Sequence, residues 1–198
     1  MRVVRVLLNL KFGIAMGVLD VPPPRPINFD RSIVFIDGTN TFESLKDNSL
    51  KVRSFYELAS IICTPRRVHR VYLYTTQEKL DQAIKVHGTE AFSKCRIVFG
   101  DFIASNKKER EKGVDAQLVA DVVYHAAVKN CEFIAIVSTD TDFRFALSRV
   151  EDFGVQTGLI AVAKPAAERL KKSCDDYLEL LPEELISQGL AERVIDPP

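Results

Sequence analysis

The segment FIAIV at residues 133–137 is an unbroken apolar run with no polar residue. Such a run, rich in β-branched residues, is typical of a strand that is buried on both faces of a parallel sheet. The polar segment STDTDF follows it directly at residues 138–143. Residues 133–137 therefore predict a central strand whose carboxyl end carries hydroxyl and carboxylate side chains.

Strand-like and helix-like segments alternate on both sides of this run. Further strands are predicted at residues 32–36, 70–74, 96–99 and 155–162. Apolar residues at helical spacing predict helices at residues 52–63, 77–93, 114–128, 142–153, 165–172 and 183–188. This alternation implies βαβ crossovers, so we expect an α/β fold. The predicted architecture is a Rossmann-like three-layer sandwich around a central, mainly parallel five-stranded sheet.

A proline-rich spacer, VPPPRP at residues 21–26, divides the chain. It cannot join a helix or a central strand, because proline lacks a backbone donor and fixes φ. We expect an apolar leader and linker over residues 1–27, a folded domain over 28–181, and a C-terminal helix and tail over 182–198. Lys11 interrupts the leader and no A-x-A site follows, so an extra strand or a poorly ordered leader is favoured over a signal peptide.

Composition excludes several classes of protein. The 198 residues include 27 Lys and Arg and 27 Asp and Glu, so the net charge is zero and binding by bulk positive charge is excluded. The four cysteines form no CxxC pair, which argues against a zinc site and for free thiols in a reducing compartment. No segment reaches the ~20 apolar residues of a spanning helix. We expect a cytoplasmic protein without a membrane partner.

Acidic residues follow the predicted strands at the edge where ligands bind in an open α/β sheet. Asp37 follows the first strand, Asp140 and Asp142 follow residues 133–137, and Asp115 lies at the start of the long helix. Each aspartate alone fits a turn or a helix N-cap. Together, converging carboxylates repel one another unless a hard cation such as Mg²⁺ or Mn²⁺ neutralises them.

Other catalytic chemistries find little support. An apolar strand followed by Asp37-Gly38-Thr39 is similar to the D-x-D-G-T signature of haloacid-dehalogenase phosphatases, but Phe35 stands where that class needs its nucleophilic aspartate. The histidines His69, His87 and His125 have no evident catalytic partners, and surface or interface positions are predicted for them.

Three motifs occur in the order found in the NYN branch of the PIN-like nuclease superfamily, which this chain resembles over residues 32–180. They are IDGTN at 36–40, KGVD at 112–115 leading into Asp121, and VSTDTDF at 137–143. The third is fairly specific, and the ordered trio is more specific still. The chain departs from the family pattern at Thr139, where glycine is common.

The resemblance implies a compact PIN-like domain and roles for particular residues. It places the metal-binding and catalytic acids at Asp37, Asp115, Asp140 and Asp142. It assigns supporting roles to other residues: Asn40 would orient Asp37 or a metal-bound water, and Ser138 and Thr139 would support the acidic loop. Lys112 would lie near the scissile phosphate or pair with an acid. Asp121 is six residues beyond Asp115, about 240° around a helix, so it is predicted to be a structural hydrogen-bond acceptor or else a residue that supports the metal ligands without touching the metal.

A basic run beside the acids supplies the expected substrate contacts. Lys107, Lys108 and Arg110 lead directly into the Asp115 segment, where cations would hold a phosphate backbone. Two other basic runs, at residues 66–70 and 164–172, are interpreted as solvated faces. Phe102 and Phe143 could stack on bases, but core positions are predicted for both.

The leading hypothesis is a Mg²⁺- or Mn²⁺-dependent endoribonuclease that hydrolyses RNA phosphodiester bonds. The alternative is a non-catalytic RNA-binding or regulatory module on the same fold. A structure-specific DNA nuclease ranks last, because the connections are short. With no net charge, affinity for long RNA should be modest, so a homodimer or a recruiting protein partner stays open.

Overall fold

A computed structural model of the chain describes residues 31–100 and 113–194 in full. For residues 8–10, 13–15, 102–103 and 110–111 it describes the backbone alone. No helix in these segments is long and apolar enough to cross a membrane. The predicted leader at residues 1–27 and the end of the predicted tail lie largely outside the described residues, so the predicted domain division stays a prediction.

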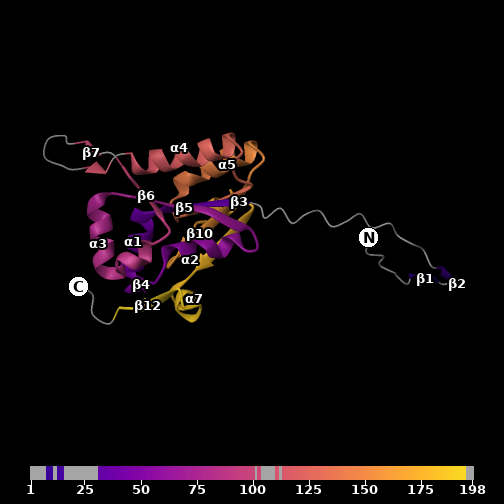
Figure 1. Cartoon of the computed structure of the whole chain (residues 1–198), viewed down its shortest axis with the longest axis horizontal. Helices are drawn as coiled ribbons and strands as arrows, with labels where there is room; N and C mark the ends of the chain where they lie inside the picture. Colours follow the sequence, from indigo (N-terminus) through magenta and orange to yellow (C-terminus); the bar gives the residue numbers. More distant parts are fainter. Residues whose placement is uncertain are drawn as a thin grey trace.

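Six parallel strands form the central sheet (Figure 1). In chain order they are β3 (Arg31–Asp37), β5 (Arg67–Thr75), β6 (Arg96–Phe99), β9 (Phe133–Val137), β10 (Gln156–Val162) and β11 (Asp176–Leu180). In space the order is β11-β10-β9-β3-β5-β6, and every neighbouring pair is parallel. The α/β sandwich is confirmed, but the predicted strand number of five is wrong because β11 was missed.

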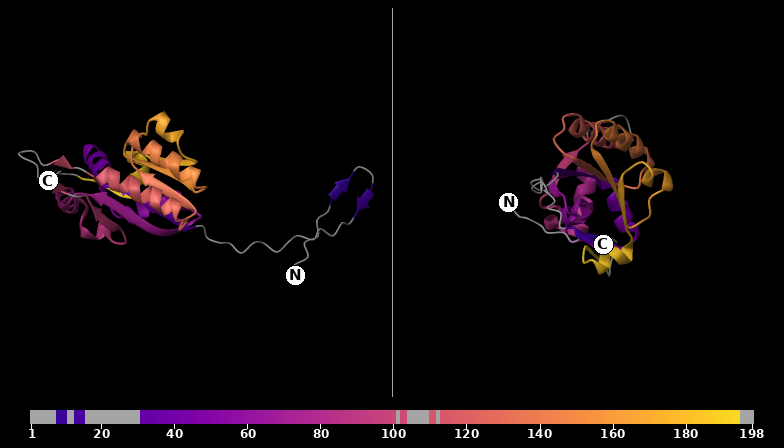
Figure 2. Two further views of the ribbon diagram at one scale, coloured as in Figure 1. Left: turned by 90° about the horizontal axis from the view of Figure 1, so that it is seen from above. Right: turned by 90° about the vertical axis from the view of Figure 1, so that its right-hand side faces the viewer.

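Helices cover both faces of the sheet. The two helices α4 (Val114–Ala127) and α5 (Arg144–Asp152) lie side by side over one face, as Figure 2 shows. The other face is covered by α1 (Gly38–Asp47), α2 (Phe55–Ser60) and α3 (Gln77–His87). Shorter helical segments are η1 (Ile61–Cys63), η2 (Thr89–Phe92), η3 (Thr141–Phe143), α6 (Glu168–Lys171) and α7 (Pro182–Ser187).

The strand β3 shows how the two layers divide the core. Ile33 and Phe35 belong to the apolar cluster under α4 and α5, whereas Val34 and Ile36 belong to the cluster under α1, α2 and α3. Successive side chains of a strand point to opposite faces, so a continuous apolar run serves both layers. The full burial of these four residues is what the apolar pattern predicts.

The helix α1 was missed by the sequence prediction because GTN at residues 38–40 looks like a turn. Asp37 accepts a hydrogen bond from the backbone N–H of Asn40 and so caps α1. Phe42 and Leu45, three residues apart, bury one side of the helix. Gly38 allows its start, because a Cβ there would lie 2.6 Å from the carbonyl oxygen of Tyr74.

Local capping corrects other predicted boundaries. The helix predicted from residue 52 begins instead at Phe55, because Ser54 accepts a hydrogen bond from the Glu57 N–H at 3.2 Å. Before it, β4 (Leu50–Val52) pairs antiparallel with β12 (Ala191–Arg193). Two more antiparallel pairs join β1 (Leu8–Leu10) to β2 (Gly13–Ala15) and β7 (Phe102–Ile103) to β8 (Arg110–Glu111).

Candidate functional site

The order of the strands creates a switch point between β3 and β9. From β3 the chain moves outward to β5 and β6, then returns to β9 and moves outward to β10 and β11. The connections that leave β3 and β9 therefore run in opposite directions, and an open α/β sheet binds its ligand in the crevice at the carboxyl ends of two such strands. The segments after both strands, starting at Asp37 and Ser138, meet at this crevice.

Asp37 is the buried centre of the crevice. Its residue is only 4% exposed. Its Oδ1 accepts from the Asn40 N–H at 3.1 Å, and its Oδ2 accepts from the Ser138 hydroxyl at 2.9 Å. Burial, together with the negative charges of Asp115 and Asp140, raises the pKa of Asp37 to about 6, although the two hydrogen bonds act to lower it. The ionised form of Asp37 therefore lowers the stability of the fold.

Asn40 joins the two segments across the crevice. Its side-chain Oδ1 accepts from both the backbone N–H of Thr139, at 3.0 Å, and the Thr139 hydroxyl, at 3.1 Å. Asn40 therefore contacts Asp37 through its backbone N–H and uses its amide for the facing loop. The threonine that replaces the usual family glycine adds one of these two bonds.

Ser138 organises the acidic loop. Its hydroxyl donates to Asp37 and accepts from the backbone N–H of Asp140 at 3.0 Å. Asp140 in turn accepts at Oδ1 from the backbone N–H of Asp142 at 2.9 Å, which caps η3. One carboxylate oxygen of Asp140 is thus engaged within its own loop, and the loop is fixed to Asp37.

The structure places the four predicted acids at different depths. Asp115 lies in the first turn of α4, is exposed, and is near enough to Asp37 to raise its pKa. Asp140 is half-buried, and Asp142 is exposed at the rim. Asp121 accepts from the Tyr74 hydroxyl at 2.7 Å, as a structural acceptor would. The charges of Asp115 and Asp140 thus act on Asp37, and Asp142 lies two residues after Asp140 in the same loop.

The predicted basic rim falls outside what can be described. Lys107, Lys108 and Lys112 lie outside the described residues, and Arg110 is described only as backbone in β8. Their role stays a prediction.

The donor set offers oxygen atoms to a cation. Within residues 31–100 and 113–194, no three His, Cys, Asp or Glu side chains are gathered into a complete metal cage. Mg²⁺ does not require one, since it is commonly held by one or two carboxylates together with waters and substrate phosphates. Asp37, Asp115 and Asp140 therefore fit a hard divalent cation by their chemistry and by their mutual repulsion.

An exposed aromatic residue beside the acids was not predicted. Phe145, in the first turn of α5, is 66% exposed, and the Arg144 guanidinium lies 4.4 Å from the centre of its ring. Phe143 is 1% exposed and belongs to the core, as predicted, and the side chain of Phe102 is not described. The helical spacing could have predicted this exposure. Ala146 and Leu147 are on the buried face of α5, and Phe145 lies outside that face.

One histidine prediction is wrong. His87 is only 7% exposed, because it packs between Phe42 and Phe55 at the end of α3. A surface or interface position was predicted because no partner is visible in the sequence, and the structure contradicts the surface position. Its partner is a backbone group, the Val52 N–H, which donates to Nδ1 at 3.1 Å.

Comparisons with known proteins concern the family and the fold of the chain. The family model described as NYN domain matches residues 31–181. Among solved structures, one of a protein of unknown function from Vibrio parahaemolyticus matches with a TM-score of 0.62 and 13% identity, covering 81% of this chain and 98% of that one. At that identity the likeness concerns the fold. No curated protein matches the chain.

Proposed function

The chain belongs to the NYN domain family, which gives it a nuclease-type fold, and from that premise we propose that it is a metal-dependent endoribonuclease. The proposal covers hydrolysis of RNA phosphodiester bonds at the crevice between β3 and β9. The divalent ion is Mg²⁺ or Mn²⁺, held by Asp37, Asp115, Asp140 and Asp142.

The observation that carries this proposal is the uncompensated carboxylate of Asp37. Its pKa is raised to about 6 by burial and by two neighbouring acids. No cationic side chain among residues 31–100 and 113–194 forms an ion pair with Asp37 or Asp140. Buried charge without a counterion is costly, and proteins keep it where a ligand supplies the opposite charge.

A bound divalent ion would lower the pKa of a coordinated water and neutralise charge on the phosphate oxygens. Residues of the chain orient the acids for this task. Ser138 and the Asn40 backbone fix both oxygens of Asp37, so the carboxylate cannot rotate. The two hydrogen bonds that Thr139 donates to the Asn40 side-chain oxygen hold the acidic loop close to the start of α1.

The substrate proposed is single-stranded RNA. Phe145 presents an exposed ring two to three residues from the acidic loop, and unpaired bases stack readily on such rings. Arg144 adds a cation beside that ring. We also propose that Lys107, Lys108, Arg110 and Lys112 contact phosphates.

A cytoplasmic location fits the cysteines. All four are free, and burial raises the pKa of each thiol, to about 11 for Cys63 and about 12 for Cys131. Unreactive free thiols suit a reducing compartment. A homodimer or a recruiting protein remains a further proposal.

The test compares RNA cleavage by the wild-type protein, Asp140→Asn and Asp47→Asn. Asp47 is exposed at the far end of α1, so its substitution matches the charge change away from the crevice. With Mg²⁺ or Mn²⁺ we expect Asp140→Asn to lose about 100-fold or more in rate, with Asp47→Asn unchanged and EDTA abolishing cleavage.

The same assay separates the alternatives. Equal cleavage by Asp140→Asn and wild type would remove Asp140 from the mechanism. RNA binding without cleavage under any metal would favour a non-catalytic RNA-binding module. Cleavage of single-stranded or duplex DNA in preference to RNA would change the substrate assignment.

A further inference from the structure

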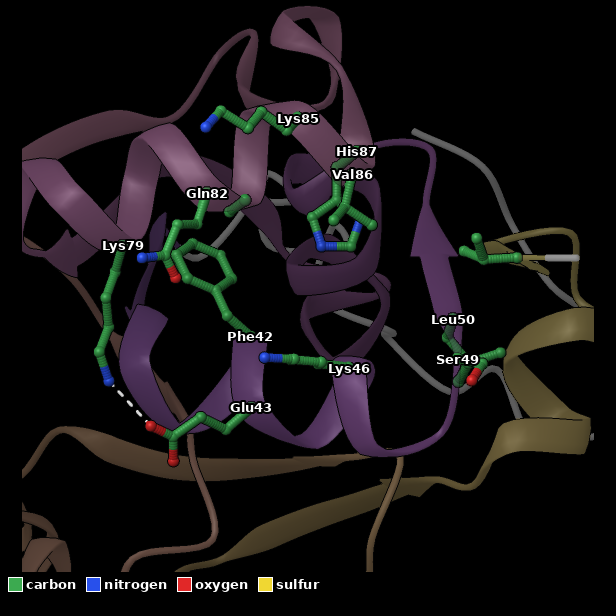
Figure 3. Close-up of a pocket in the computed structure, with 12 residues that line it drawn as sticks. Phe42, Glu43, Lys46, Ser49, Leu50, Lys79, Gln82, Lys85, Val86 and His87 are labelled. Atoms are coloured by element: carbon green, nitrogen blue, oxygen red, sulfur yellow. Dashed lines mark hydrogen bonds and ion pairs between the residues drawn. The ribbon is translucent and has the colours of Figure 1, made fainter. Parts of the chain in front are cut away.

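A pocket of about 520 Å³ lies between α1 and α3, and none of the four predicted acids lines it (Figure 3). Lys46 from α1 and Lys79 and Lys85 from α3 line it, together with Glu43. Lys79 forms an ion pair with Glu43 at 2.8 Å. Lys46 and Lys85 are exposed, and neither forms an ion pair with any described residue. The pocket therefore carries a net positive charge among its described lining residues.

A buried donor lies in the same pocket. His87 lines it, and its Nδ1 accepts from the Val52 N–H at 3.1 Å. Burial, with a smaller effect of Lys51, lowers the pKa of His87 to about 4, so the ring is neutral at pH 7. A neutral ring that accepts at Nδ1 carries its proton at Nε2. No described residue accepts a hydrogen bond from that Nε2–H. The Nε2 atom is not fully buried.

The pocket begins at the same edge of the sheet as the acids. The helix α1 starts directly after Asp37, and α3 starts just after β5, whose Tyr74 lies opposite Asp37 in register. Along α1, Glu43 is about 9 Å from Asp37 at 1.5 Å per residue. This pocket between α1 and α3, called the groove below, thus runs away from the crevice. The lysines and the Nε2–H of His87 lie along it.

We propose that this groove binds phosphates of the RNA strand that extends from the acidic crevice. Lys46 and Lys85 are the cations, the Nε2–H of His87 is a fixed donor, and the ring of Phe42 forms part of the apolar wall. Phosphate contacts of this kind hold a strand in place without reading its sequence. The inference rests on the proposed function for the identity of the strand.

Binding is measured in Asp140→Asn protein with EDTA, so that neither cleavage nor metal affects the result. The variant is Lys46→Ala/Lys85→Ala, and the control is Lys129→Ala/Lys172→Ala, which removes two exposed lysines elsewhere. For a labelled single-stranded RNA of about 20 nucleotides, we expect the variant to weaken affinity about tenfold. The slope of log affinity against log salt should fall by about 1.4, since each phosphate contact contributes about 0.7.

Equal affinity and salt slope in the variant and the control would overturn the proposal. A second readout needs no substitution at the groove: the ring nitrogen signals of His87 in NMR should shift when RNA is added, and unchanged signals at saturation would also overturn it. Adenosine monophosphate distinguishes the source of the phosphate. If it saturates the groove as tightly as the RNA does, the assignment to a strand is wrong.

Failure here is distinguishable from failure of the proposed function. Wild-type protein that cleaves RNA while the groove variant binds normally would contradict the groove alone. Groove-dependent binding without cleavage under any metal would contradict the nuclease alone.

Discussion

Charged side chains are arranged differently at the two edges of the central sheet. At the amino edge, opposite charges pair: Arg31 bonds to Glu132 at 3.2 Å, and Arg66 bonds to Asp176 at 3.3 Å. At the carboxyl edge, charges of one sign are gathered around the buried Asp37.

The difference indicates where the proposed divalent ion would act. Arg66 is satisfied from within the chain, by Asp176, by Gln156 at 2.9 Å and by the ring of Phe133 at 4.2 Å. Asp37 has hydroxyl and amide donors but no ion pair with a described cation. Each of the following experiments would sharpen or break this contrast.

The largest effect expected is stabilisation by a divalent ion that acts at the carboxyl edge alone. Mg²⁺ at a hundred times its Kd should raise the free energy of unfolding by about 2.7 kcal/mol. Thermal unfolding would measure it, with NaCl of equal ionic strength as the control. The increase should vanish in Asp37→Asn/Asp140→Asn and persist in Glu132→Gln; an undiminished increase in the double variant would place the ion elsewhere.

Next in size is the loss of a satisfied cation from the amino edge. Arg66→Ala should lower the free energy of unfolding by about 2 kcal/mol, because it removes two hydrogen bonds and a cation–π contact at a mostly buried side chain. Arg67→Ala, at an exposed neighbour, is the matched control in urea denaturation. The rate of RNA cleavage should be equal in both, and a drop in Arg66→Ala alone would contradict the separation of the edges.

Asp37→Asn should have the opposite sign. A carboxyl whose pKa is raised from 3.8 to about 6 on folding destabilises the protein progressively as pH rises between these values, and fully above them. At pH 7 the amide should therefore stabilise the fold by about 1–2 kcal/mol while removing cleavage. Urea denaturation at pH 4 and pH 7 would measure this, since the gain should shrink at pH 4. Equal gains at both pH values would mean that ionisation of Asp37 is not its cause.

The smallest effect belongs to the exposed pair at the amino edge. Partial desolvation raises the pKa of Glu132, but the hydrogen bonds and charge of Arg31 outweigh it, so the pKa is lowered. Its stabilisation is present near pH 7 and is lost as pH falls below its ordinary value of 4.5. Glu132→Gln should cost less than about 1 kcal/mol, because both side chains are nearly half exposed. Added salt should reduce that cost, and a cost that salt leaves unchanged would argue for packing.

Buried elements were predictable because their burial is written in the sequence. Residues 133–137 form a strand with the predicted bounds, because a short apolar run of this kind is buried on both faces of a parallel sheet. The strand β11 was missed because its segment, DYLEL, is short, mixes acidic and apolar residues without a clear pattern, and lies at a half-exposed edge of the sheet. The helix α1 was missed because its cap and first turn have the composition of a loop.

Part of the candidate site was predictable as positions but not as contacts. The chain order of strands and the rule for open sheets indicate that Asp37 and Asp140 approach one another. The bond from Ser138 to Asp37 and that from Thr139 to the Asn40 amide depend on the register of β3 against β9, which no local pattern encodes. Likewise, the partner of His87 is the backbone of β4, far away in sequence.

The pairing of β4 with β12 can form only late in the synthesis of the chain. Leu50–Val52 emerges early, yet its partner Ala191–Arg193 is synthesised about 140 residues later. At about 5–20 residues per second, that delay is roughly 7–28 s. During this interval Leu50 and Val52 are without the strand that covers them, and they lie beside the pocket that contains His87. The lysine-lined groove therefore reaches its final form after β3 and β9 have already been made, so the acids can be assembled before the surface that would guide a strand to them.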